Sequence, residues 1–120
     1  MTRYLQTAAF VVVLLGSTPV SCLAAEPDAA ASEEASKSLY KLVSEVRTYL
    51  HGLKDKSNET RFDDDQNAWE QHRSSQALFI AGMASADESL YKRSYFQTYN
   101  RLTQERITFL KQVLELSISY

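Results

Sequence analysis

Two histidines and a run of three aspartates are the residues of this chain whose types could support acid–base or metal chemistry. His51 lies in an expected turn and His72 on an expected helix, and neither has a serine or cysteine partner at the spacing of a nucleophile–base pair. The run Asp63–Asp65 cannot converge on one metal ion, because consecutive helical residues point about 100° apart. We therefore expect no catalytic residue, no cofactor and no metal site, and hence a protein that is not an enzyme.

The composition and net charge exclude further classes of function. The 120 residues hold 13 Lys and Arg against 15 Asp and Glu, a net charge of −2. This slightly acidic balance lacks the basic footprint of a nucleic-acid-binding protein and suits a basic partner. Cys22 is the single cysteine, so the chain cannot form an internal disulfide. Its stability must come from the packing of apolar side chains.

The first 25 residues resemble a secretion signal. Arg3 supplies the positive start and Ala8–Leu15 an apolar run, which is too short for the ~20 residues that span a bilayer. Small residues allow cleavage after Ala24 or Ala25, which predicts a periplasmic or secreted protein. Alternatively, Val20–Cys22 resembles the end of a lipobox, and the cysteine would then carry a lipid anchor.

Three helical stretches are expected after a flexible, solvated lead-in at 26–34. Gly52 and Gly82 separate them, and no proline follows the lead-in. The expected helices span roughly 33–53, 61–81 and 86–116. The first carries a regular apolar stripe of Leu39, Leu42, Val43, Val46, Tyr49, Leu50 and Leu53. Short turns between such helices predict an all-α fold, an antiparallel three-helix bundle that forms one domain over 35–120.

Capping patterns and charged residues at apolar positions refine this prediction. Thr60 with Asp63, and Ser85 with Glu88, fit capping boxes at the starts of the second and third helices. Arg73 and Arg106 lie at core-like positions on their helices, where a guanidinium must be paired if it is buried. We expect both to be at least half buried and hydrogen-bonded. Trp69 is expected in the core.

The order of three weak motifs carries a family resemblance. The second helix contains Gln66-x-x-Trp69-x-x-x-Arg73, and the third contains Leu102-Thr103-x-x-Arg106-x-x-x-Leu110. Together with Leu39-Tyr40-x-Leu42 in the first helix, they resemble the LprI-like domain of small exported bacterial proteins, over about Leu39 to Leu114. The family usually has cysteines where this chain has Ala77 and Thr98, and an aromatic residue where it has His72. The resemblance thus implies the loss of one disulfide.

Some members of that family are described as lysozyme inhibitors. The resemblance implies a periplasmic module that binds a lysozyme-type muramidase and blocks glycan hydrolysis by protein–protein contact. The polar turn 51–58, with His51, and the acidic residues Asp63, Asp64 and Glu70 are the expected contact surface. Two other functions remain open: an immunity-type protein that neutralises a secreted cell-wall-degrading toxin, and a structural or adaptor subunit of the cell envelope.

Overall fold

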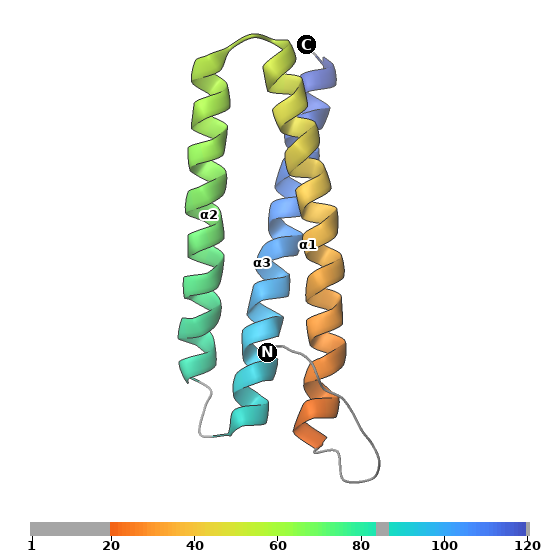
Figure 1. The fold of residues 1–120 in the computed structure, drawn as a ribbon, viewed down its shortest axis with the longest axis vertical. Helices are drawn as coiled ribbons and strands as arrows, with labels where there is room; N and C mark the ends of the chain where they lie inside the picture. Colours follow the sequence, from red (N-terminus) through yellow and green to blue (C-terminus); the bar gives the residue numbers. More distant parts are fainter. Residues whose placement is uncertain (1–19, 84–86, 120) are drawn as a thin grey trace.

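The computed structural model describes the backbone of residues 20–83 and 87–119 and the side-chain surroundings of 28–83 and 87–117. Three long helices form the fold: α1 (Val20–Gly52), α2 (Lys56–Met83) and α3 (Glu88–Ser119). They run antiparallel in chain order and make a rod of 57 × 28 × 21 Å (Figure 1). The expected all-α three-helix bundle is confirmed. The apolar run 8–15 and Ser85 lie outside the described residues.

The apolar core lies between α1 and α3. Leu39, Val43 and Val46 of α1 pack against Ile107 and Leu110 of α3, and all five are buried. Partly buried side chains surround this cluster: Leu42, Leu50, Phe62, Trp69, Val113 and Leu114. The stripe on α1 is thus confirmed for Leu39, Leu42, Val43, Val46 and Leu50, whereas Tyr49 is exposed. Its last expected member is exposed, because Leu53 follows the end of the helix.

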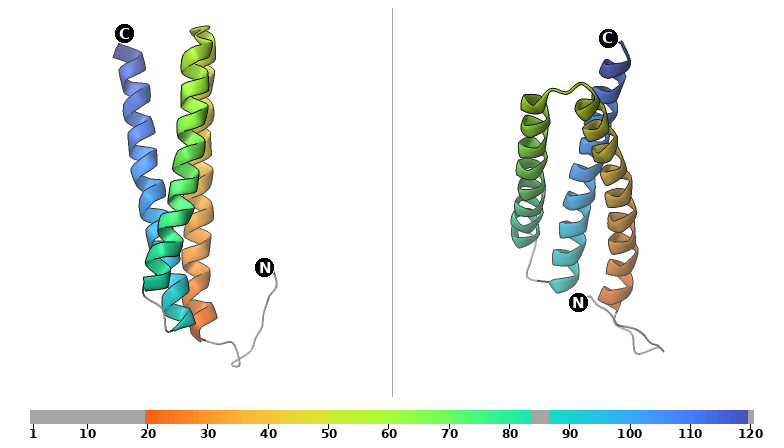
Figure 2. Two further views of the ribbon diagram at one scale, coloured as in Figure 1. Left: turned by 90° about the vertical axis from the view of Figure 1, so that its left-hand side faces the viewer. Right: turned by 45° about the horizontal axis from the view of Figure 1, so that its top comes forward.

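The second helix contributes no large apolar side chain that is fully buried, although its partly buried Phe62 and Trp69 pack against the core. Its buried side chains are Gln66, Arg73, Ala77 and Ala81. It packs mainly on α3 and to a smaller extent on α1. The right-hand view of Figure 2 shows α3 between the two other helices. Because α3 contacts both other helices, it is the helix that holds the bundle together, as the width of its apolar face indicates.

The helix starts differ from the expected ones. α1 begins at Val20, so the segment 26–34 is helical rather than an irregular lead-in, and Ser32 is buried. α2 begins at Lys56 because Asp55 caps it: its Oδ1 accepts the backbone N–H of Asn58 at 3.2 Å. Thr60 is therefore inside the helix and is not its cap. Asp87 caps α3 by accepting the N–H of Ser89 at 2.8 Å.

The turn between α1 and α2 is shorter than the expected 51–58 segment. Gly52 ends α1, Lys56 starts α2, and only Leu53, Lys54 and Asp55 lie between them. The left-handed residue is Lys54, with φ of 58°, and Gly52 does not adopt a positive φ. Gly82 is part of the last turn of α2. Neither glycine is therefore the point at which the chain reverses.

A disulfide between positions 77 and 98 should be compatible with this packing. Ala77 on α2 and Thr98 on α3 are both buried, and the two helices pack on each other. In a Cys22→Ser background, Ala77→Cys with Thr98→Cys should crosslink and raise stability by roughly 3 kcal/mol, since the closed loop has about 20 residues. Thermal melts with and without reductant would measure the gain. Failure to crosslink on oxidation would contradict the predicted proximity of the two Cα atoms.

Candidate functional site

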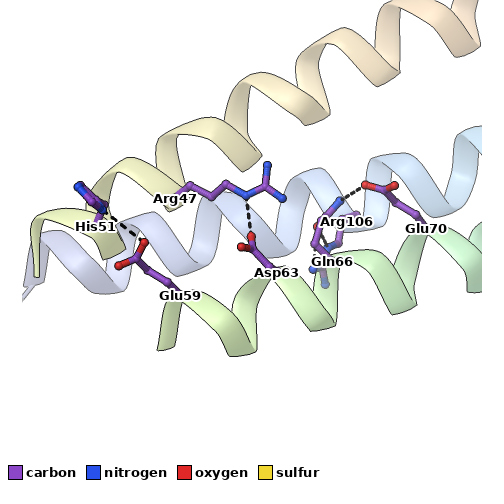
Figure 3. A network of polar contacts seen from close by, with 7 residues as sticks. All are labelled: Arg47, His51, Glu59, Asp63, Gln66, Glu70 and Arg106. Atoms are coloured by element: carbon purple, nitrogen blue, oxygen red, sulfur yellow. Dashed lines mark hydrogen bonds and ion pairs between the residues drawn. The ribbon is translucent and has the colours of Figure 1, made fainter. Parts of the chain in front are cut away.

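A buried polar network joins α2 to α3. Arg106 of α3 is 8% exposed, and its Nε and Nη2 donate to Oε1 of Gln66 at 3.1 and 2.9 Å. Nη2 also donates to Oδ2 of Asp65 at 2.8 Å. Gln66 is fully buried and donates through Nε2 to Glu70 at 3.2 Å (Figure 3). The arginine charge is thus balanced by one carboxylate and by an amide oxygen that accepts two hydrogen bonds.

The second arginine is buried more deeply, and none of the hydrogen bonds the structure gives it goes to a carboxylate. Arg73 is 4% exposed and donates to the Thr103 hydroxyl at 3.1 Å and to the Tyr40 hydroxyl at 3.3 Å. The Thr103 hydroxyl in turn donates to the Tyr99 carbonyl oxygen at 2.8 Å, which orients it as an acceptor for Arg73. Arg73 therefore connects all three helices.

Aromatic rings provide the rest of the environment of the two guanidiniums. The Arg73 guanidinium carbon lies 4.1 Å from the Tyr99 ring centre and 4.6 Å from that of Trp69. Trp69 also faces the Arg106 guanidinium at 5.4 Å. A cation over an aromatic face gains up to about 2 kcal/mol when the pair is desolvated. Trp69 is partly buried and packs against the apolar core, as expected, but it does so at the edge, where both guanidiniums lie over its ring.

Tyrosines extend this cluster along α3. Tyr95 stacks on Tyr99 with ring centres 5.7 Å apart and meets Phe96 edge-on at 5.3 Å. Burial raises the pKa of Tyr95, and the neighbouring Tyr99 adds to the increase. Its hydroxyl therefore stays neutral at physiological pH. The cluster is part of the helix packing, and it gives the interior no acid or base poised near neutrality.

Apart from this α2–α3 network, a shallow groove lies between the last turns of α1 and the first turns of α2. It has a volume of about 320 Å³ and is lined by Arg47, Thr48, Leu50, His51, Glu59 and Asp63. Arg47 donates to Asp63 at 2.7 Å, and His51 Nδ1 lies 3.4 Å from Glu59 (Figure 3). The groove thus contains two basic side chains from α1, and each is paired with a carboxylate of α2.

The run Asp63–Asp65 illustrates how helical spacing separates neighbours. Asp63 pairs with Arg47 of α1, Asp65 pairs with Arg106 of α3, and Asp64 points to solvent. These aspartates lie two turns inside α2, so the expected helix-start role is wrong: Asp55 has it. Within the described residues, no group of His, Cys, Asp and Glu could hold a metal ion.

The four expected partner-binding residues do not form one patch. His51 and Asp63 share the groove, Asp64 is exposed beside it, and Glu70 is held by Gln66 farther along α2. Burial and hydrogen bonding of Arg73 and Arg106 are confirmed. Sequence reasoning missed Arg47, Glu59 and Tyr40, which link α1 to α2. Each flanks an apolar stripe, and that position could have indicated contact with the next helix.

One family of known proteins matches most of this chain. A family model described as "Lysozyme inhibitor LprI" matches residues 22–110. The match starts near the beginning of α1 and ends at Leu110 of α3, so it includes both buried arginines and their partners. No curated protein and no solved structure matches the chain.

Arg106→Ala should destabilise the domain by about 1–3 kcal/mol, because Gln66 would keep a buried amide oxygen without its donors. Arg101→Ala is a matched control on the same helix: Arg101 is exposed and pairs with the exposed Glu105, so its loss should cost less than about 1 kcal/mol. Denaturant unfolding of both variants measures the difference. Equal stability of the two variants would contradict a structural role for the Arg106–Gln66 contact.

Proposed function

Because this chain belongs to the LprI family of lysozyme inhibitors, we propose that it is an exported protein that binds a lysozyme-type muramidase and blocks it by direct contact. The family match over residues 22–110 carries this proposal. The family is one of inhibitors and not of catalysts. A function that depends on surface contact agrees with an interior whose polar groups are committed to helix packing.

The first half of α2 is the part of the surface best suited to a basic enzyme. All five acidic residues of this helix, Glu59, Asp63, Asp64, Asp65 and Glu70, lie before residue 71. Asp63, Asp65 and Glu70 are already engaged within the bundle, whereas Asp64 is exposed. We therefore place the strongest long-range attraction at Asp64, with the His51–Glu59 edge of the groove beside it.

Electrostatic attraction would act mainly on the encounter of the two proteins. Many lysozymes are basic and cleave glycan between two carboxylates in a cleft. Complementary charge raises the association rate more than the strength of the final contacts, and salt screens it beyond about 10 Å at 0.1 M. Binding through this surface should therefore weaken as ionic strength rises.

Stoichiometric amounts of the purified protein should slow the lysis of cell-wall substrate by lysozyme. Asp64→Asn should lower the association rate roughly a few-fold at low salt, with little change in dissociation, because the residue acts on encounter. Glu33→Gln, which removes one exposed charge from α1, is the control and should have a smaller effect. Surface plasmon resonance measures both rates.

Equal effects of the two variants would show that net charge acts rather than the position of Asp64. If the folded protein binds no class of lysozyme at micromolar concentrations, the inhibitor proposal is wrong, and the immunity or adaptor function becomes the better account.

Export would leave the described interior intact. Cleavage after Ala24 or Ala25 removes no buried side chain of the described part, in which Ser32 is the first buried residue. None of the helices that the structure describes is long and apolar enough to cross a membrane. Cleavage of the signal is what would release the protein into the periplasm or the medium.

The intact mass of the exported protein should correspond to a chain that begins at residue 25 or 26. Mass spectrometry of the protein purified from the envelope and the medium measures this directly. Retention of the first 24 residues would contradict cleavage, and a diacylglyceryl group on Cys22 would instead make the protein a lipid-anchored one.

A further inference from the structure

The second half of α2 carries an exposed face with an unusual composition. After Glu70 the helix has one residue with a full charge, Arg73, and that side chain is buried. The exposed residues of this half include no Lys, Arg, Asp or Glu: they are Gln71, His72, Ser74, Ser75, Leu78, Phe79, Gly82 and Met83. Charged residues make up 23% of the whole chain. Depletion of charge and the presence of Phe and Met mark the centre of protein interfaces.

Large apolar side chains gather at the end of this face. Phe79 is 62% exposed and Met83 74%, and both lie on one side of α2, one turn apart. Leu78 near the end of α2 and Leu90 near the start of α3 are also about half exposed. The end of α2 and the start of α3 lie at the same end of the bundle (Figure 1). With about 150–250 Å² for each large side chain, these fractions leave roughly 400 Å² of apolar surface uncovered. Apolar surface of that total size, gathered at one end of a bundle, is of the order that often marks an interaction site.

We infer that this charge-free half of α2 is the contact surface of a homodimer, and that its occupant is a second copy of the chain. In a two-fold symmetric contact a patch meets itself, so any net charge on it would repel its copy. The chain as a whole is acidic, and this is the stretch of α2 that avoids such repulsion. A basic partner, in contrast, would find no carboxylate here.

The charge distribution also selects the direction of the contact. If the two α2 helices lay parallel, their acidic first halves would lie side by side, which like charges disfavour. An antiparallel crossing near Phe79 places these halves at opposite ends of the dimer. The charge-free stretch has 13 residues and is about 20 Å long. Its exposed apolar area is smaller than the ~800 Å² that each partner buries in a stable complex. The dimer should therefore be of modest, micromolar affinity.

This arrangement leaves the proposed lysozyme-binding surface free in both copies. Asp64 and the groove lie toward the other end of α2, four turns from Phe79. Dimerisation and inhibition therefore depend on different residues, and one can fail without the other.

Sedimentation equilibrium of the purified full chain, from micromolar to submillimolar concentrations, should show reversible conversion to twice the monomer mass. Phe79→Glu should raise the dimer dissociation constant about 30-fold or more, as expected for a central apolar contact. Leu116→Glu is the matched control: Leu116 is 59% exposed and lies near the end of α3, at the opposite end of the bundle from Phe79. Its effect should stay within about two-fold.

A mixed sample tests whether the face meets itself. Phe79→Lys and Phe79→Glu chains should each be monomeric, and an equimolar mixture at low salt should recover dimer, because opposite charges then meet across the symmetry axis. Circular dichroism confirms that each variant keeps its helices. Phe79→Glu should also still inhibit lysozyme, so that loss of the dimer is separated from loss of the proposed function.

Three results would overturn the inference. The first is a chain that stays monomeric throughout the concentration range. The second is a dimer that Leu116→Glu weakens as much as Phe79→Glu does, or that the charge-swapped mixture fails to restore. The third is a monomer that floats with phosphatidylcholine vesicles unless Phe79 is replaced, which would assign the face to a lipid surface.

Discussion

Two guanidinium groups buried between α2 and α3 are the constraint on which the rest of the structure depends. A buried cation is expensive unless each of its donors is engaged, and removal of a partner leaves an uncompensated group. Arg106 meets this requirement at Nε and Nη2 with Gln66 and Asp65. Arg73 meets it in part: Nη1 and Nη2 donate to two hydroxyl groups and the guanidinium lies against two aromatic rings, whereas the buried Nε has no hydrogen-bond partner among the described residues. Such contacts work in one geometry, so they determine the rotation and the height of α2 against its neighbours. An apolar seam would tolerate sliding more readily.

Because of this constraint, the three helices contribute differently to the stability of the bundle. The α1–α3 pair buries the large aliphatic side chains and supplies most of the apolar stabilisation. The second helix buries two alanines besides its polar residues, and it is joined to the pair through the arginine network, the Arg47–Asp63 contact and the packing of Phe62 and Trp69 against the core. Most acidic side chains of its first half are engaged within the bundle, and Asp64 is exposed. The exposed residues of its second half include no Lys, Arg, Asp or Glu.

A preorganised binding surface needs a rigid support, and this chain lacks the disulfide that its family resemblance implies. Ala77 is one turn from Arg73, and Thr98 is adjacent to Tyr99, which stacks on the same arginine. The arginine–aromatic cluster thus lies beside the positions where a crosslink would have been. It joins the same two helices by hydrogen bonds and by stacking, and Tyr40 brings α1 into the same contact. The surface of α2 that we assign to a basic partner rests on this support.

Local pattern alone determined much of this protein: three helices, their order, the apolar stripe of α1 and the burial of Arg73 and Arg106. These features follow from spacing along the chain and from the cost of burying an unpaired charge, both of which can be evaluated in sequence. Tertiary structure decided the rest. Asp55 rather than Thr60 caps α2, since several residues of the segment could serve and the packing of the turn selects one. The three consecutive aspartates have three different roles, because each faces a different neighbour. Trp69 lies at the edge of the core because two guanidiniums from different helices flank its ring, and no local pattern states which distant residues will meet there.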